Sequence, residues 1–198
     1  MVRTSARRRR RLGPFVAVPV LLVLAVIIWA VATLGPASDR IADAFPLKGK
    51  AAPLIEGDTI AGTKLRLGDY QGRWVLVNFM ASWCNPCKKE HPELVEFAEA
   101  HDAKGDAAVI SVAANDSEAD ARAFFAERGG NWPVLVDSDG TWATKYGMIK
   151  LPESYLVSPS GVVVAKFISV ITAEAVDSLI AQFEDAARQA SAATTVAS

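Results

Sequence analysis

Continuous apolar runs and amphipathic segments follow one another along the body of the chain. The runs at 74–80 and 107–114 contain almost no polar residues, which is typical of strands covered on both faces of a sheet. Two short strands around a glycine-containing turn are predicted between residues 54 and 72. After that hairpin, strands are predicted at 74–80, 107–114, 133–137, 154–158 and 161–170.

The segments between these runs have the pattern of helices. In the last one, Val176, Leu179, Ile180 and Phe183 follow the i, i+3, i+4, i+7 spacing of one helical face. Helices are predicted at 84–101, 117–128, 141–147 and 172–188. A β-α-β-α-β order that ends in an apparent hairpin and a helix predicts an α/β sandwich.

An uncharged apolar run at residues 15–34 follows a block of arginines near the N-terminus. A helix of about 20 residues spans ~30 Å, the thickness of the hydrocarbon core of a bilayer. Because basic residues stay on the cytoplasmic side, the pattern predicts a single-pass anchor with the body outside the cytoplasm. A cleavable signal peptide is the alternative, since Ala30-Val31-Ala32 resembles a cleavage site, although the run is longer than the usual apolar region of such peptides.

Charge is distributed unevenly along the chain. Six of the 21 Lys and Arg residues fall within the first eleven positions, so the remainder carries 15 basic against 22 acidic residues, a net charge of −7. An acidic body argues against nucleic acid as a partner, because phosphate binding needs a basic face.

The two cysteines, Cys84 and Cys87, stand where an apolar strand runs into a helix. Cys84 is predicted at the helix N-terminus, where unpaired N–H groups and the helix dipole favour the thiolate form. Cys84 is therefore predicted to be the nucleophile. Cys87, one turn further in and more buried, is predicted to be the resolving thiol. The pattern indicates a redox-active disulfide.

Two other interpretations of the C-x-x-C pattern have less support. A zinc site needs two more ligands, and the spacing to His91 and His101 does not fit a zinc finger, so both histidines are expected on the helix surface. A purely structural disulfide would close so short a loop that it would constrain the unfolded chain only weakly. Neither a metal nor another cofactor is predicted.

The segment VLVNFMASWCNPCKKEHPEL resembles the active site of the membrane-anchored, thioredoxin-like TlpA/ResA/CcmG (DsbE) family of thiol–disulfide oxidoreductases. The later segment VLVDSDGTWATKYGMIKLPESYLVSPSGVV is similar to the second half of that family, so the resemblance covers residues 54–186. It implies a thioredoxin fold with an N-terminal β-hairpin and a central strand–helix insertion, preceded by one transmembrane helix. The chain then divides into a cytoplasmic basic segment (1–11), a transmembrane signal-anchor (12–35), a linker (36–46), a thioredoxin-like domain (47–188) and a flexible tail (189–198).

The resemblance also implies roles for single residues. Cys84 and Cys87 match the attacking and resolving thiols, and Pro92 matches the proline that kinks the active-site helix. Pro152 matches the family's cis-proline beside the disulfide, where a backbone edge can bind substrate chain through strand-like hydrogen bonds. The residues expected to line the substrate groove are Trp83, Pro86, Leu151 and Pro152.

Two acids are expected to tune the thiols and to carry protons. Glu90 lies one helical turn beyond Cys87 on the same face, at a spacing where ResA-like proteins carry a glutamate with this role. Glu153 follows the expected cis-proline, as in the CcmG members, and a carboxylate beside a buried thiol can shuttle protons. The alternatives are an exposed helix glutamate at 90 and a solvated loop acid at 153.

One position departs from thioredoxin itself, as is usual for the anchored family, and two depart from what is common in the family. Asn78 stands where thioredoxin has a buried aspartate, which moves proton transfer to Glu90 or Glu153. Met80 stands where a tryptophan is common, and Lys150 where a glycine is common. The charge of Lys150 is expected to alter the groove and its affinity for acidic or thiolate partners.

The resemblance implies a reductase of protein disulfides, with the C-x-x-C-H disulfide of apocytochrome c as substrate and a membrane thiol carrier of the CcdA/DsbD type as electron donor. Between the cysteines, Asn85-Pro86 keeps the proline of reducing thioredoxins and lacks the histidine of oxidising DsbA, which favours a reductase over a disulfide-forming oxidase. A non-catalytic binding or chaperone domain is a second alternative. A peroxiredoxin is a third, but its Pro-x-x-x-Thr-x-x-Cys pattern is missing at Cys84.

Overall fold

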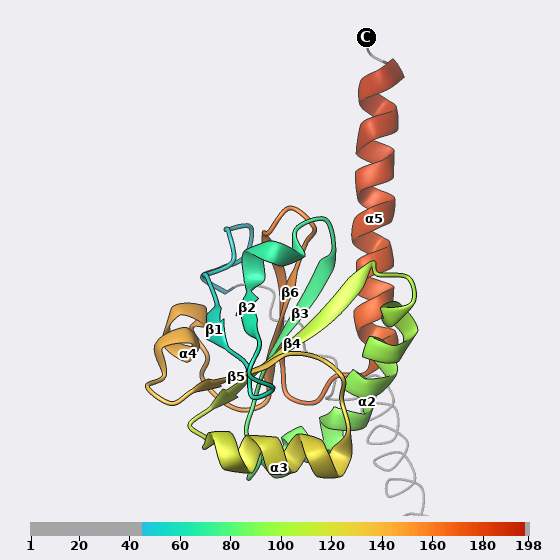
Figure 1. Ribbon diagram of the computed structural model, residues 1–198. Helices are drawn as coiled ribbons and strands as arrows, with labels where there is room; N and C mark the ends of the chain where they lie inside the picture. Colours follow the sequence, from blue (N-terminus) through green and yellow to red (C-terminus); the bar gives the residue numbers. More distant parts are fainter. Residues whose placement is uncertain (1–44, 197–198) are drawn as a thin grey trace, which may run out of the picture. The chain divides into compact units, whose positions relative to one another are not determined.

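A five-stranded mixed sheet forms the centre of the described chain (Figure 1). Its strands are β3 (Trp74–Met80), β4 (Ala107–Ala114), β5 (Val134–Asp137), β6 (Glu153–Val157) and β7 (Val163–Ile168), in the spatial order β5-β4-β3-β6-β7. The structure is a computed structural model and describes residues 45–196. β3, β4 and β5 are parallel, whereas β6 runs antiparallel to both β3 and β7. This arrangement places the ends of β3 and β4 together at one edge of the sheet.

Helices and the hairpin cover the two faces of this sheet. Successive side chains of each strand point to opposite faces, so a continuous apolar run leaves apolar side chains on both faces that must be covered. The elements are β1 (Glu56–Asp58), β2 (Lys64–Arg66), the 3-10 turn η1 (Leu67–Tyr70), α2 (Asn85–Asp102), α3 (Glu118–Arg128), α4 (Thr141–Tyr146) and α5 (Ala173–Val196). Leu76 of β3 packs with α2 and α5, for example with Phe97 and Val176. Val77 of β3 packs on the other face with the hairpin and with Tyr146 of α4.

The predicted order of strands and helices is confirmed, and the main difference lies at the C-terminal end. The last helix, predicted to end at Arg188 and to be followed by a flexible tail, continues to Val196. The added segment is rich in alanine, the strongest helix former, and it contains no glycine or proline that would end the helix. Side chains at 189–194 are exposed, so this extension adds little to the core.

The predicted transmembrane segment, residues 12–35, lies outside the described part of the chain. Within residues 45–196, none of the helices has the length and apolar content needed to cross a membrane. The described residues belong to one contact unit, Ser38–Ser198.

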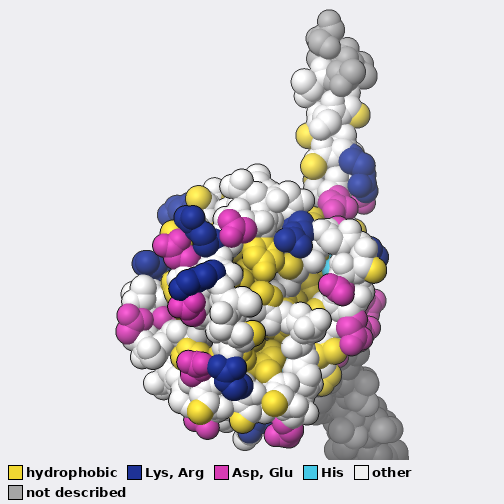
Figure 2. Space-filling model, in the orientation of Figure 1, with side chains coloured by type: hydrophobic (Ala, Val, Ile, Leu, Met, Phe, Trp, Pro, Cys, Tyr) yellow, Lys and Arg dark blue, Asp and Glu magenta, His cyan; other side chains and the backbone are white. Residues whose placement is uncertain are grey.

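Figure 2 shows hydrophobic side chains gathered in the middle of one face, with Lys, Arg, Asp and Glu side chains around them. One hollow of about 460 Å³ on the molecule is lined by Tyr70, Arg73 and Trp132, by the first residues of β4 and by the last turns of α2. β3 and β4 are parallel, and the cysteines follow the other end of β3. This hollow is therefore separate from the site of the cysteines.

Candidate functional site

The disulfide lies where β3 passes into α2. Cys84 is the N-cap residue of α2, and its Sγ accepts a hydrogen bond from the backbone N–H of Cys87 at 3.2 Å. A disulfide joins the two cysteines, whose Cα atoms are 5.3 Å apart. Pro86 stands in the first turn of the helix, where its missing N–H and fixed φ are well tolerated. The geometry expected for Cys84 at a helix N-terminus is confirmed.

Burial alone does not distinguish the two cysteines in this disulfide form. Cys84 is 5% exposed and Cys87 3% exposed, so Cys87 is the more buried of the two, as predicted, but only by a very small margin. The two differ in what they face. Cys84 lines a surface groove together with Trp83, Asn85 and Pro86, and Cys87 is not among the residues that line it. Cys84 is therefore the cysteine that faces the groove.

The groove has two walls and a volume of about 460 Å³. One wall is the turn from Trp83 to Pro86. The other is the segment from Met148 to Leu151, which leads into β6. Trp83 is 57% exposed and Ile149 81% exposed, and Lys150 is also exposed. Large apolar side chains open to solvent on both walls make a surface suited to a polypeptide segment.

The bond between Leu151 and Pro152 is cis, as expected from the family resemblance. Pro152 itself is buried, and its carbonyl accepts a hydrogen bond from the backbone N–H of Ser169 at 3.1 Å. Leu151 is the member of this pair that lines the groove.

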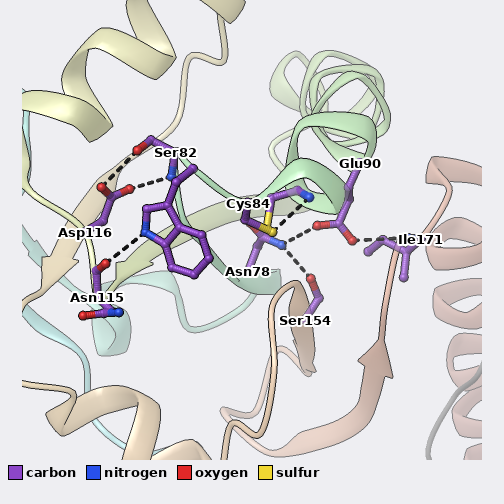
Figure 3. Close-up of a disulfide and its surroundings, with 10 residues drawn as sticks. Asn78, Ser82, Cys84, Glu90, Asn115, Asp116, Ser154 and Ile171 are labelled. Carbon is purple, nitrogen blue, oxygen red and sulfur yellow. Dashed lines mark hydrogen bonds between the residues drawn. A yellow bond between two sulfur atoms is a disulfide. The ribbon is translucent and has the colours of Figure 1, made fainter.

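A carboxylate that follows β4 holds the turn before Cys84 in place (Figure 3). Asp116 accepts hydrogen bonds from the backbone N–H of Ser82 at 2.6 Å and from its hydroxyl at 3.0 Å. The indole N–H of Trp83 donates to the carbonyl of Asn115 at 3.1 Å. Neither Asn115 nor Asp116 is predicted from the sequence. The sequence does contain a signal for them, which is a pair of polar residues directly after β4. Because the parallel strands β3 and β4 end at the same edge of the sheet, residues that follow β4 lie close to the turn that follows β3.

Glu90 lies at the centre of a buried polar network on the α2 face of the sheet (Figure 3). Its side chain is buried, and its carboxylate accepts hydrogen bonds from Asn78 Nδ2 at 2.9 Å and from the backbone N–H of Ile171 at 3.2 Å. Asn78 Nδ2 also donates to the hydroxyl of Ser154 at 2.9 Å. Within the described chain, Asn78 Oδ1 has no hydrogen-bond partner. The alternative of an exposed helix glutamate is therefore wrong.

Burial raises the pKa of Glu90 to about 8, although the hydrogen bonds from Asn78 and Ile171 act in the opposite direction. A carboxyl group with this pKa exchanges its proton in the neutral range. Glu90 thus has the property expected of a group that gives or takes protons one helical turn from Cys87.

Glu153 is fully buried, so the alternative of a solvated loop acid is wrong too. Its Oε2 lies 2.8 Å from Lys166 Nζ, which is also buried, and accepts hydrogen bonds from the Tyr155 hydroxyl at 3.0 Å and the Ile149 N–H at 3.3 Å. Burial, followed by the nearby Glu153 carboxylate, raises the pKa of Tyr155, which keeps that hydroxyl a donor.

The two predicted acids lie on opposite faces of the sheet. Ser154 is paired with Asn78 in the register of β3 and β6, and Glu153 is paired with Phe79. Directly paired residues share a face, and neighbours along a strand alternate. Glu90, which bonds to Asn78, is therefore on the α2 face, whereas Glu153 is on the face of Phe79 and α4. The sequence predicts both acids at the thiols, but Glu153 is tied to Lys166, Tyr155 and Ile149 instead.

Both histidines, expected on the helix surface, are buried: His91 is 3% and His101 6% exposed. His91 Nε2 lies 2.9 Å from the Gly129 carbonyl, inside a cluster with Phe124 and other aromatic rings of α3 and the following loop. Burial lowers the pKa of His91. His101 lies between two carboxylates at 2.7 and 2.8 Å, so its role is to join α2 to its neighbours.

Thioredoxin-like thiol–disulfide oxidoreductases have an exchangeable disulfide at the start of the helix that follows a central strand. The fold and the site described above put this protein in that class. The chain belongs to the AhpC/TSA family, whose profile matches residues 48–166, more than half of its length. The family resemblance expected from the sequence is confirmed.

Known relatives agree with this class. A protein named thiol-disulfide oxidoreductase ResA from Bacillus thuringiensis subsp. konkukian (strain 97-27) is 33% identical over 116 residues, 59% of this chain and 66% of that protein. The ResA of Bacillus subtilis (strain 168) is 29% identical over 133 residues, 67% of this chain and 72% of that protein. The chain thus spans about two thirds of the length of these relatives.

A solved structure shows the same fold. The crystal structure of a candidate thiol:disulfide interchange protein DsbE from Chlorobium tepidum matches with a TM-score of 0.62 and 29% identity. The match covers 70% of this chain and 96% of that one. The thioredoxin-like α/β fold expected from the sequence is therefore confirmed for the body of the chain.

Proposed function

We propose that this protein is a thiol–disulfide reductase that transfers two electrons from the Cys84–Cys87 dithiol to disulfides of other proteins. The observation that carries this proposal is the position of Cys84, which caps α2 and lines the groove. The helix N-terminus favours the thiolate, which is the attacking form in disulfide exchange.

The reaction has two exchange steps. The Cys84 thiolate attacks one sulfur of the substrate disulfide, forms a mixed disulfide and releases the other substrate sulfur as a thiolate. The Cys87 thiolate then attacks Cys84 Sγ, which forms the intramolecular disulfide and releases the second substrate thiolate. Glu90 takes up the proton of Cys87 and returns it in the next cycle, because its raised pKa suits both directions at neutral pH.

The proposed substrate is the C-x-x-C-H disulfide of apocytochrome c, with electrons supplied by a membrane thiol carrier of the CcdA/DsbD type. This part of the proposal is supported by the likeness to proteins named ResA and DsbE. The proposed location is the cytoplasmic membrane, with the thioredoxin-like domain outside the cytoplasm, and it is supported by the arginine block and the apolar run at 15–34.

The direction of electron flow is tested by equilibrating the Cys84–Cys87 pair with glutathione. We expect a potential near that of thioredoxin, about −270 mV, because the dipeptide between the cysteines keeps the proline and has no histidine. A potential near about −120 mV, that of DsbA, would show an oxidase instead. The substrate is tested with an oxidised C-x-x-C-H peptide against a control peptide whose two cysteines are further apart.

The topology is tested separately with a reporter that is active only outside the cytoplasm, fused after Ser198. We expect the fusion to be active. A second reporter, which works only in the cytoplasm, is fused at the same place. Activity of that second fusion would refute the proposed location.

A further inference from the structure

Two buried, oppositely charged side chains lie behind one wall of the groove. Glu153 opens β6 and Lys166 lies in β7, and their side chains are 0% and 4% exposed. Lys166 Nζ lies 2.8 Å from Glu153 Oε2 and 5.2 Å from the centre of the Tyr155 ring. Neither charge reaches solvent, and Glu153 Oε1 has no partner within the described residues.

Both side chains also hold the backbone of the segment 147–151. Lys166 Nζ donates to the Gly147 carbonyl at 3.1 Å, and the Ile149 N–H donates to Glu153 Oε2 at 3.3 Å. This segment has no helix or strand structure of its own, and its residues from Met148 to Leu151 form the groove wall opposite Trp83. The exposed Ile149 side chain therefore depends on two buried charges for its position.

Fold stability alone does not account for such a pair. Taking two charges out of water costs about as much as their attraction returns, and apolar replacements of buried pairs are often neutral or stabilising. What the pair does supply here is two directed hydrogen bonds, to the carbonyl of Gly147 and the N–H of Ile149. The start of the segment is also tied to α4, because the N–H groups of Gly147 and Met148 donate to carbonyls of that helix.

We propose that Glu153 and Lys166 are positioning residues that hold the segment 147–151 and thereby set the wall against which the disulfide-bearing segment of the substrate lies. This inference rests on the proposed function. It differs from the expectation that Glu153 carries protons to the thiols, because the carboxylate lies on the sheet face away from Glu90 and contacts the wall, β6 and β7.

Two double variants of the full chain form a matched pair for the test. Glu153→Gln with Lys166→Met removes both charges but keeps an acceptor for the Ile149 N–H. Glu153→Leu with Lys166→Met removes the charges and the acceptor. Neither variant leaves an uncompensated buried charge, so both are expected to fold.

Three measurements read the result: KM and kcat for a peptide disulfide, the rate with a small aromatic disulfide that reaches Cys84 but has no peptide chain to lie against the 148–151 wall, and amide hydrogen exchange at Ile149. We expect the Leu variant to raise KM for the peptide about tenfold above the Gln variant, as the loss of one hydrogen bond allows. Its Ile149 amide is expected to exchange faster, and its rate with the small disulfide to equal that of the wild type.

Equal KM values and equal Ile149 exchange in the two variants would overturn the proposal. It would also be overturned if both variants lost activity toward the small disulfide, because the carboxylate would then act on the thiols. If the wild type reduces neither disulfide, the proposed function fails, but the exchange at Ile149 still decides whether Glu153 holds the wall.

Discussion

Asn78 Nδ2 donates a hydrogen bond to the Glu90 carboxylate at 2.9 Å, and this contact joins the central strand β3 to the helix that carries both cysteines. Asn78 is fully buried, and its Oδ1 has no partner within residues 45–196. With the amide in this orientation, both Asn78 and Ile171 donate to Glu90, which matches the ionised carboxylate. When Glu90 is protonated, a reversed Asn78 amide can accept a hydrogen bond from the carboxyl O–H through Oδ1, which otherwise has no partner within the described residues.

The raised pKa of Glu90 makes the free energy of unfolding depend on pH. Because this pKa is about 8 in the folded protein, against an ordinary value of 4.5, the folded state holds one more proton than the unfolded state between these values. The contribution of Glu90 to the free energy of unfolding is fully present below about pH 4.5. It is lost as pH rises toward 8, at up to about 1.4 kcal/mol per pH unit. Urea unfolding of the full chain across this range measures the slope.

Glu90→Gln is the matched variant, since it is neutral at every pH and similar in shape. We expect it to remove that part of the pH dependence and to be more stable than the wild type at pH 8. It is also expected to slow turnover, because the amide takes up no proton. Identical pH slopes for the two proteins would show that Glu90 titrates as an ordinary exposed acid.

His91 gives a pH dependence of the opposite sign. Burial lowers its pKa in the folded protein, so below about pH 6.5 the unfolded chain binds a proton that the folded chain does not. Stability from this group is therefore lost as pH falls. His91→Phe is expected to remain folded among the rings of Phe124 and Phe125 and to lose less stability between pH 6.5 and 5 than the wild type. Equal losses over this range would contradict the prediction.

Much of the fold follows from local pattern. The apolar runs predict β3 and β4 with the bounds that the structure has, because both are covered on two faces and a charged residue precedes each. The C-x-x-C spacing and the strand-to-helix junction likewise predict the position of Cys84. The last helix is longer than the pattern predicts. The amphipathic pattern stops near Arg188, but the high helix propensity of the alanines beyond it allows the helix to continue to Val196.

The polar contacts of the site could not be read from the sequence. Asn78, Glu90 and Ser154 are brought together by the pairing of β3 with β6 and by the docking of α2, which join positions far apart in the chain. The face on which Glu153 lies depends on the register of β6, because a shift by one residue would exchange it with Ser154. The burial of His101 depends on Asp177 in α5, which is equally remote in sequence.

Removal of the Asp116 carboxylate is expected to loosen the turn that precedes Cys84. Asp116→Ala loses the hydrogen bonds from the Ser82 N–H and hydroxyl, at a cost of about 1–3 kcal/mol in unfolding free energy. We expect turnover of a protein disulfide to fall as well, because Trp83 follows Ser82 in the groove wall. Asp116→Asn, which keeps one acceptor oxygen, should lie between the wild type and the Ala variant in both measurements.

The C-terminal extension of α5 is expected to be dispensable for folding. A chain that ends at Arg188 lacks residues 189–198, and the side chains at 189–194 are exposed. Its unfolding free energy should therefore stay within about 0.5 kcal/mol of the wild type. A chain that ends at Ser178 is the control. It lacks Ile180, which is buried, and Phe183, which packs on Trp74, so it should lose about 2–5 kcal/mol. A large loss in the longer chain would assign a structural role to the extension.

The two cysteines are expected to have separate roles in disulfide exchange. Cys84 caps α2 and lines the groove, so it should form the first bond with substrate, and the thiol of Cys87 should release it. Cys87→Ser is therefore expected to accumulate a mixed disulfide between Cys84 and the substrate, because nothing resolves it. Cys84→Ser should accumulate none. Non-reducing electrophoresis detects the adducts, and mass spectrometry assigns the cysteine in each. If Cys84→Ser traps substrate, or if iodoacetamide modifies Cys87 before Cys84 in the reduced wild type, the order of attack derived from the groove is wrong.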